Sequence, residues 1–180
     1  RAYQAGRVKF HTRIDERSAA FLALGISKAT KSPAVVICTS GSAAANFHPA
    51  ILEAHHSAIN LIAITADRPA RLRRTGSNQT TNQVGIFGGA VNVSLDICAP
   101  AKPEIGQIAK WRGEISAALS ESGPIHLNLQ FEEPLIGELE WVEPLSVGIP
   151  EVEEKLEPLP RPLKSYETHG VILVGHDRAE

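Results

Sequence analysis

Methionine is absent from this sequence of 180 residues, cysteine occurs only twice, and aromatic side chains make up just 5% of it. Also absent are any apolar run near the roughly 20 residues of a membrane-spanning helix and any leader that ends in a small-residue cleavage site. The sequence therefore argues against a membrane span and against secretion. Because the first residue is Arg1 rather than methionine, we expect that the start was cut from a longer chain.

The two cysteines, Cys38 and Cys98, each lie in an apolar, strand-like run. A free cysteine in such a run behaves as a small buried hydrophobe, and the spacing of the pair matches no metal or redox motif. A disulfide between them stays open as an alternative, but we expect free thiols in a reducing, cytoplasmic protein.

Charge is distributed unevenly along the chain, although the net charge is only −2. Residues 1–130 hold 14 Lys or Arg against 8 Asp or Glu, whereas residues 131–168 hold 3 against 10, together with half of the 12 prolines. Such an acidic, proline-rich stretch packs poorly and is typical of a linker. We therefore expect one core domain over 1–130, a linker over 131–168 and the first strand of a central domain within 169–180.

The hydrophobic pattern alternates between short β-branched runs and helical periodicity. The predicted helices run from near Glu16 to Thr30, over 42–56 and over 104–122. The predicted strands cover residues 34–39, 61–66, 91–97 and 125–130. The first strand should be fully buried, residues 8–11 form a strand-like entry to the first helix, and Pro49 should kink the second helix or start a new one.

This alternation of strands and helices predicts an α/β fold, in which a mainly parallel sheet is covered by helices on both faces. Folds of this class bind their ligands beyond the carboxyl ends of the strands. Candidate functional residues are therefore sought in the loops at that edge of the sheet.

Glu16 is the first candidate for chemistry, because it lies at the start of an apolar helix. The structural alternative is a capping carboxylate, since the first turns of helices are commonly acidic. Its neighbour Asp15 is itself a plausible N-cap. Spacing alone favours the structural role for Glu16.

Two polar loops follow predicted strands. Residues 39–46, Thr-Ser-Gly-Ser-Ala-Ala-Ala-Asn, either bring a ligand close to backbone N–H groups or simply form a tight turn. They contain neither a Walker A sequence nor the Gly-x-Ser-x-Gly elbow, which disfavours a serine hydrolase. The second loop carries arginines at 68, 71, 73 and 74, which suit carboxylate or phosphate but are usually solvated. Without interleaved aromatics, this loop is not expected to bind nucleic acid.

Four short motifs together resemble one family. They are Arg-Ile-Asp-Glu-Arg-Ser-Ala at 13–19, the loop at 39–46, Thr-Ala-Asp-Arg-Pro at 65–69 and Ser-Asn-Gln at 77–79. In this order and spacing they are similar to the 2-succinyl-5-enolpyruvyl-6-hydroxy-3-cyclohexene-1-carboxylate synthases of menaquinone biosynthesis, which are thiamine-diphosphate enzymes. The resemblance covers roughly residues 8–100 and implies a pyrimidine-binding domain that is truncated at its N-terminus.

The resemblance assigns cofactor roles to individual residues. In this family a glutamate hydrogen-bonds N1′ of the cofactor's pyrimidine, and Glu16 matches it, which reverses the preference for a capping role and implies a catalytic one. Gln79 matches a glutamine beside the cofactor, and Ser42 and Asn46 are expected to line the pyrimidine pocket. The Gly-Asp-Gly motif that holds Mg²⁺ or Mn²⁺ and the diphosphate is missing here, so the metal is expected on a C-terminal domain supplied by a partner subunit.

The implied enzyme decarboxylates 2-oxoglutarate and adds the resulting succinyl carbanion equivalent to isochorismate. Both substrates carry two carboxylates, which require positive, bidentate donors. Arg68 matches a family arginine at the isochorismate site, and Asn78 and Gln79 are expected beside the bound substrate. The active site is expected between the subunits of a homodimer or homotetramer, so these 180 residues alone should bind thiamine diphosphate poorly and turn over no substrate.

Two alternatives stay open at this point. A related thiamine-diphosphate enzyme such as acetolactate synthase shares the fold and the glutamate. A non-catalytic α/β module whose arginine loop binds an anionic ligand or a partner protein would account for the arginines without catalysis.

Overall fold

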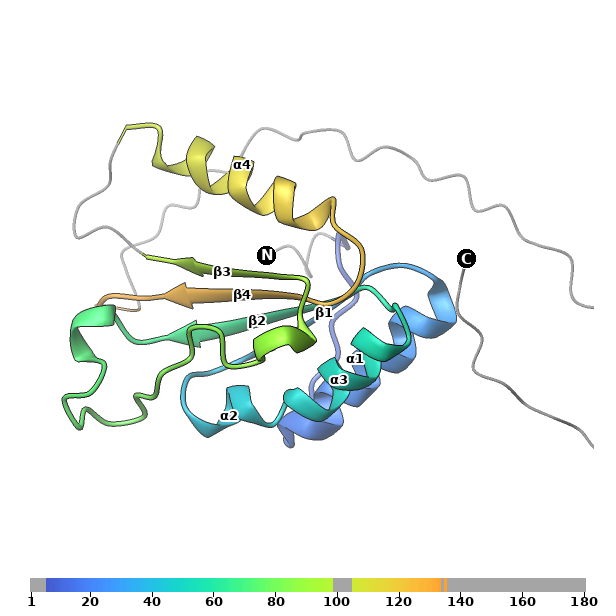
Figure 1. Cartoon of the computed structure of the whole chain (residues 1–180), viewed down its shortest axis with the longest axis horizontal. Helices are drawn as coiled ribbons and strands as arrows, with labels where there is room; N and C mark the ends of the chain where they lie inside the picture. The colour runs from blue at the N-terminus through green and yellow to red at the C-terminus, as the bar shows by residue number, and fades with distance from the viewer. Residues whose placement is uncertain (1–5, 99–104, 134, 136–180) are drawn as a thin grey trace, which may run out of the picture. The chain divides into compact units, whose positions relative to one another are not determined.

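A computed structural model describes residues 6–98, 105–133 and 135 of the chain, and within this part the strands form one four-stranded parallel sheet (Figure 1). The strands are β1 (Ala34–Cys38), β2 (Leu61–Asp67), β3 (Val93–Ile97) and β4 (Ile125–Gln130). Their order in the sheet is β1-β2-β4-β3, and every neighbouring pair is parallel. The predicted mainly parallel α/β sheet is therefore confirmed.

Helices cover both faces of this sheet, as the alternating pattern predicted. The helices are α1 (Glu16–Thr30), α2 (Ser42–Ala45), α3 (His48–His56) and α4 (Gln107–Leu119). Figure 1 shows α4 on one side of the strands and α1, α2 and α3 on the other. Two single-turn 3-10 helices, Ala70–Leu72 and Gly88–Ala90, lie in the long segment between β2 and β3.

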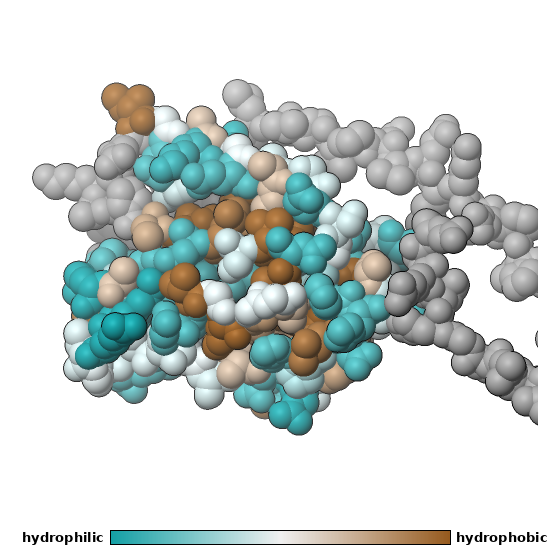
Figure 2. All heavy atoms as spheres, viewed as in Figure 1, coloured by the Kyte–Doolittle hydropathy of each residue, from teal (hydrophilic) through white to brown (hydrophobic). Residues whose placement is uncertain are grey.

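Each face of the sheet has its own hydrophobic core. On the α1 and α3 side, the buried aromatic rings of Phe47 and Phe87 pack with small residues of the helices and with Val36 of β1. The core on the α4 side is smaller. Its buried residues are Ala118 of α4 and Ile62, Ile125 and Leu127 of the sheet. In Figure 2 hydrophobic side chains are visible mainly in the band between α4 and the loops below the sheet, while hydrophilic side chains cover the loop after β2.

Pro49 starts a new helix rather than kinking a continuous one. The predicted helix over 42–56 is split into α2 and α3, and Pro49 lies in the first turn of α3. Proline is tolerated there because the first N–H groups of a helix have no partner inside it. The break lets α2 serve as a short connection from β1 to the longer α3.

Two strand predictions were wrong. Residues 8–11 do not form a strand, and the side chains of Val8 and Phe10 are 50% and 65% exposed. β1 is not fully buried, because it lies at the edge of the described sheet, where Val35 and Ile37 are more than half exposed. A β-branched run predicts a strand without saying whether it pairs on one side or on both.

The cysteines also differ from the prediction. Both are free thiols, as expected, but only Cys38 is partly buried, whereas Cys98 is exposed. Cys98 follows the last residue of β3, so it has left the packed part of the strand. A residue at the end of an apolar run need not share the burial of that run.

Other predictions fall partly or wholly outside the described residues. The linker over 131–168 and the strand within 169–180 belong to that part, apart from 131–133 and 135, and they stay predictions. The helix predicted over 104–122 is shorter, because α4 begins at Gln107 after the left-handed Gly106 and ends at Leu119. Among the described residues no helix is both long and apolar enough to cross a membrane.

Candidate active site

The turn that leaves β1 is built around Gly41. This residue has φ +91°, a left-handed conformation that side chains with a Cβ rarely adopt, and it directly precedes α2. A Cβ added to Gly41 would lie 3.2 Å from Cγ of Gln79. Glycine is therefore required here both by the backbone angle and by the close approach of a second segment.

Gln79 fastens the loop after β2 to this turn. Its Nε2 donates to Oγ1 of Thr39 and to the backbone carbonyl of Ser40, each at 3.0 Å. Ser40 Oγ in turn donates to the Gln79 carbonyl at 2.9 Å. Gln79 has φ +54°, an uncommon value for a residue with a Cβ, and such strain is often found at functional sites. The structure thus brings together two of the loops that the motifs singled out.

Gln83 is a third participant, which the sequence reasoning missed. Its side chain is fully buried, its Oε1 accepts from the Gly41 N–H at 2.8 Å, and its Nε2 donates to the Ala66 carbonyl and to Asn128 Oδ1. One amide therefore links the turn after β1 to β2 and β4. The available signal was slight: a glutamine that ends a polar loop directly before the apolar residues of the next segment.

Asp15 rather than Glu16 caps α1. The Asp15 backbone is extended, and its Oδ1 accepts from the Ser18 N–H at 2.7 Å. Hydrogen bonds from the Ser18 side chain, and then from its N–H, lower the pKa of Asp15. This is the usual arrangement of an N-cap. Glu16 is the first residue of the helix, is partly buried, and its carboxylate has no hydrogen-bond donor within the described part of the chain. Asp15 therefore fills the capping role that was the structural alternative for Glu16.

The carboxylate of Glu16 is close enough to the end of β1 to act on Cys38. Burial first, and then the negative charge of Glu16, raise the pKa of the Cys38 thiol to about 12. Cys38 is the last residue of β1 and directly precedes the 39–42 turn. Glu16 is thus near the end of β1 from which that turn leaves.

Ser42 and Asn46 bracket α2. Ser42 is exposed at the first helical position, and its carbonyl accepts from Asn46 Nδ2 at 3.1 Å. The Asn46 amide is thus used inside its own helix, and its side chain is only partly exposed. Both residues lie just beyond the carboxyl end of β1, and their role at a pyrimidine pocket stays a prediction.

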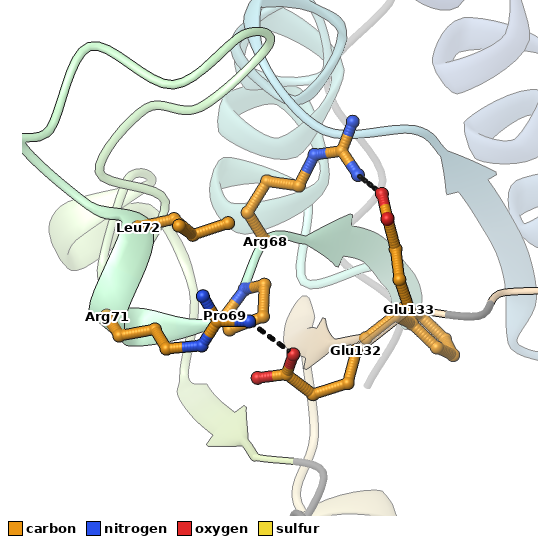
Figure 3. A pocket seen from close by; sticks show the side chains of 7 residues that line it. Arg68, Pro69, Arg71, Leu72, Glu132 and Glu133 are labelled. Carbon is orange, nitrogen blue, oxygen red and sulfur yellow. Dashed lines mark hydrogen bonds and ion pairs between the residues drawn. The ribbon is translucent and has the colours of Figure 1, made fainter.

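Arg68 projects from the carboxyl end of β2 into a pocket of about 210 Å³ (Figure 3). Its side chain is 27% exposed and lies 3.9 Å from the carboxylate of Glu133, which is itself largely in solvent. Beside it, Arg71 donates to Glu132 at 2.7 Å, and this hydrogen bond raises the pKa of Arg71. The remaining lining comes from Pro69, Leu72 and Phe131.

The ion pair of Arg68 holds it only weakly. Exposed pairs at such a distance contribute about 0–1 kcal/mol. An incoming carboxylate could therefore replace Glu133 as the partner of Arg68 at little cost, and a planar guanidinium can bind it through two parallel hydrogen bonds. The pocket suits an anionic ligand on this ground.

Asn78 is exposed, and its backbone carbonyl accepts from Thr80 Oγ1 at 3.1 Å. It adjoins Gln79 in sequence, and within the described part of the chain only its backbone carbonyl takes part in a hydrogen bond. No cluster of three or more His, Cys, Asp or Glu suited to a metal occurs in the described ranges.

Two neighbouring strand ends carry the candidate residues. Because β1 pairs with β2 in parallel, with Cys38 opposite Thr65, the turn after β1 and the Arg68 loop lie at one edge of the sheet. Glu16, Ser42, Asn46 and Gln79 gather at the β1 end, and Arg68 lies at the β2 end. A ligand that spans both strand ends would thereby meet a partly buried carboxylate, an amide in a strained turn and a guanidinium.

Comparison with known proteins identifies the class of protein to which this site belongs. Residues 1–86 match the family of thiamine pyrophosphate enzymes, in their N-terminal TPP binding domain. This part of the chain is therefore such a domain, and the parallel α/β sheet is consistent with it.

Within that class the chain resembles one particular enzyme. It is 50% identical to the 2-succinyl-5-enolpyruvyl-6-hydroxy-3-cyclohexene-1-carboxylate synthase of Thermobifida fusca over 73% of this chain and 25% of that protein. The synthase of Saccharopolyspora erythraea is 51% identical over 80% of this chain and 27% of that protein. For the synthase of Arthrobacter sp. the identity is 40%, over 96% of this chain and 30% of that protein.

These relatives confirm the resemblance that four motifs indicated. The chain spans about a quarter of the length of the relatives that it matches. The activity, substrates and partners of a whole synthase are therefore matters for a proposal.

Proposed function

We propose that this chain forms part of a thiamine-diphosphate-dependent synthase that decarboxylates 2-oxoglutarate and adds the succinyl carbanion equivalent to isochorismate, in menaquinone biosynthesis. The observation that carries the proposal is the position of Glu16. Glu16 is partly buried near the end of β1, it is not needed as the helix cap, and its carboxylate has no hydrogen-bond donor in the described part of the chain.

The residues around Glu16 fit the pyrimidine end of the cofactor. A partly buried carboxylate can hold a hydrogen bond to a ring nitrogen and exchange a proton with it, since little water competes there. The left-handed Gly41 keeps the neighbouring turn free of a side chain, and Gln79 presents its amide beside it. When bound, thiamine diphosphate would supply the electron sink for decarboxylation.

The remaining parts of the proposal concern groups that other segments would supply. Mg²⁺ or Mn²⁺ and the diphosphate would be held by a C-terminal domain of the partner subunit in a homodimer or homotetramer. In the 180-residue chain, residues 1–86 match only the N-terminal TPP binding domain, which supports a site shared with a further domain. A cytoplasmic location belongs to the same proposal.

Arg68 would bind a carboxylate of isochorismate. The residue is partly exposed in its pocket and paired only loosely with Glu133 at 3.9 Å. Asn78 and Gln79 follow on the same loop and would contact the bound substrate. Isochorismate carries two carboxylates, so losing one guanidinium should weaken its binding rather than abolish it.

The decisive test replaces Glu16 by Gln in the full-length protein. Glu16→Gln keeps the size and polarity of the side chain but removes its ability to exchange a proton. We expect the rate of product formation from 2-oxoglutarate and isochorismate to fall about 10²- to 10⁴-fold, the usual contribution of a positioned acid or base. The matched control is Asp15→Asn, the same acid-to-amide change one residue away, which keeps a good N-cap and should leave the rate within about twofold.

A near-normal rate in Glu16→Gln would remove the catalytic role and favour a non-catalytic anion-binding module. The choice among related enzymes needs a second assay. The unmodified protein should form product from 2-oxoglutarate plus isochorismate and none from pyruvate alone. Turnover of pyruvate would point to an acetolactate synthase instead.

A further inference from the structure

The sheet carries an unusual set of polar side chains directly beneath the Arg68 loop. Asp67, Asp96, Asn128 and Gln130 lie near the carboxyl ends of three adjacent strands, β2, β3 and β4. The register places Asp67 opposite Gln130 and Asp96 opposite Asn128. Three of the four, Asp67, Asn128 and Gln130, are buried. Buried polar groups at this density are costly unless they are fully paired, so the set requires an explanation.

Arg73 closes this set by bridging its two carboxylates. Its Nη2 donates to Asp67 Oδ2 at 2.8 Å and to Asp96 Oδ1 at 3.2 Å. The Arg73 side chain is only 16% exposed, that of Asp67 is 0% exposed, and that of Asp96 is 25% exposed. Although burial opposes the shift, hydrogen bonds from Arg73, and then from Asn128 and Gln130, lower the pKa of Asp96. Both acids are thus held as partners of one guanidinium.

The same groups hold the backbone on both sides of Arg68. Asp67 Oδ1 accepts from the N–H of Arg68 itself at 2.8 Å. Gln130 Oε1 accepts from the Ala70 N–H at 2.8 Å, while Gln130 Nε2 donates to Asp96 Oδ2 at 2.9 Å. One route therefore runs from Arg73 through Asp67 to Arg68. A second runs from Arg73 through Asp96 and Gln130 to Ala70.

We propose that Arg73 is a positioning residue, which fixes the backbone from which Arg68 projects and thereby sets the affinity of the site for its carboxylate-bearing substrate. The inference rests on the proposed substrate role of Arg68. Arg73 Nη2 is engaged by Asp67 and Asp96, so in this proposal Arg73 acts on the substrate through Arg68. A displacement of about 1 Å in a binding group strongly lowers its contribution to binding. The hydrogen bonds that hold the N–H groups of Arg68 and Ala70 therefore bear directly on substrate affinity.

The test uses the full-length protein with Arg73→Gln and Asp96→Asn. Arg73→Gln should raise the KM for isochorismate about tenfold, while kcat stays within about twofold, because the effect is on binding. Asp96→Asn is the milder change, since its oxygen can still accept hydrogen bonds, and should raise KM about threefold. The control is Arg74→Gln, which removes the same charge from an exposed side chain of the same loop and should leave KM unchanged.

A purely structural role would lower the amount of active enzyme and hence the apparent kcat, without a change in KM. A second readout is independent of activity: amide hydrogen exchange in the 68–72 segment should quicken at least about tenfold in Arg73→Gln and not in Arg74→Gln. If Arg73→Gln does not fold, Asp96→Asn carries both measurements. Wild-type KM and wild-type exchange in the folded variants would overturn the inference.

A double-mutant cycle separates failure of this inference from failure of the proposed function. If Arg73 acts through Arg68, then Arg68→Gln and the double variant should have the same raised KM. Additive effects would overturn the route through Arg68, while the substrate role of Arg68 would stand. A wild-type KM in Arg68→Gln alone would refute the substrate role and, with it, the inference.

Discussion

Ser40 and Gln79 exchange two hydrogen bonds, although they are 39 positions apart: the hydroxyl of Ser40 donates to the Gln79 carbonyl, and the amide of Gln79 donates to the Ser40 carbonyl. The pair joins the turn after β1 to the loop after β2 at the edge of the sheet where the candidate residues gather. The absence of a side chain at Gly41 leaves room for this close approach of Gln79.

Gly41→Ala should therefore destabilise the fold. The new Cβ would meet Gln79 Cγ at 3.2 Å and would force alanine to adopt φ +91°. Strain of this kind costs about 1–3 kcal/mol, which equilibrium urea unfolding would detect as a lower midpoint. The control is Gly25→Ala inside α1, where a Cβ meets nothing within 4 Å. That change should stabilise the protein by about 0.5–1 kcal/mol, and equal effects of the two substitutions would contradict the role of Gly41.

The two cysteines should differ sharply in reactivity. Cys98 is exposed, whereas the pKa of Cys38 is raised to about 12 by burial and by the charge of Glu16. Only the thiolate reacts, so a thiol reagent at pH 8 should modify Cys98 rapidly and Cys38 very slowly. Mass spectrometry of the modified peptides would measure both rates.

The labelling experiment also tests the position of Glu16. Removing its charge lowers the pKa of Cys38, so Glu16→Gln should speed modification of Cys38 while leaving Cys98 unchanged. Glu53→Gln is the control, because Glu53 is exposed on α3 and its charge does not raise the pKa of Cys38. An unchanged Cys38 rate in Glu16→Gln would mean that the carboxylate does not face the end of β1.

The different roles of Asp15 and Glu16 at the start of α1 give a third prediction. Asp15→Ala removes the bond to the Ser18 N–H and should cost about 1 kcal/mol of unfolding free energy, while Asp15→Asn should cost little, since asparagine caps equally well. Glu16→Gln should cost no more than about 0.5 kcal/mol, from the helix dipole. Urea unfolding at neutral pH compares all three. A larger loss from Glu16→Gln than from Asp15→Ala would return Glu16 to a structural role.

Local sequence signals predicted the fold well where each element has its own pattern. The N-cap at Asp15 and the parallel α/β sheet follow from spacing and backbone chemistry, whereas the pattern around Pro49 left a kink and a new helix open. The burial of β1 and of Cys98 was missed, because burial depends on which neighbours lie beside a strand. No short window of sequence contains that information.

The candidate site was predictable only in part, for a similar reason. Motifs singled out Glu16, Arg68 and Gln79, but the buried Gln83 and the partly buried Arg73, which organise their surroundings, are recognised only by long-range hydrogen bonds. An arginine in a polar loop is usually solvated, and nothing local distinguishes Arg73 from the exposed Arg74. The distinction arises from Asp96, which β3 places beside β4.

His126 should make stability depend on pH. Its side chain is fully buried in β4, where Nε2 lies 2.9 Å from Thr65 Oγ1, and the ring packs edge-on against Phe87. Burial lowers the pKa of His126 from its usual 6.5 to about 4, against the attraction of Asp96 and Asp67. The unfolded chain therefore binds more protons between pH 6.5 and pH 4, so stability is fully present above pH 6.5 and is lost as the pH falls through this window.

The loss attributable to His126 should reach roughly 3 kcal/mol at pH 4, as the size of the shift implies. Unfolding free energies from urea titrations at half-unit pH steps would measure it. His126→Gln should lower stability at pH 7, because a buried contact is lost, yet flatten the slope between pH 6.5 and pH 4. The exposed His55 provides the control, since His55→Gln should keep the wild-type slope. A slope that survives in His126→Gln would assign the pH dependence to another group.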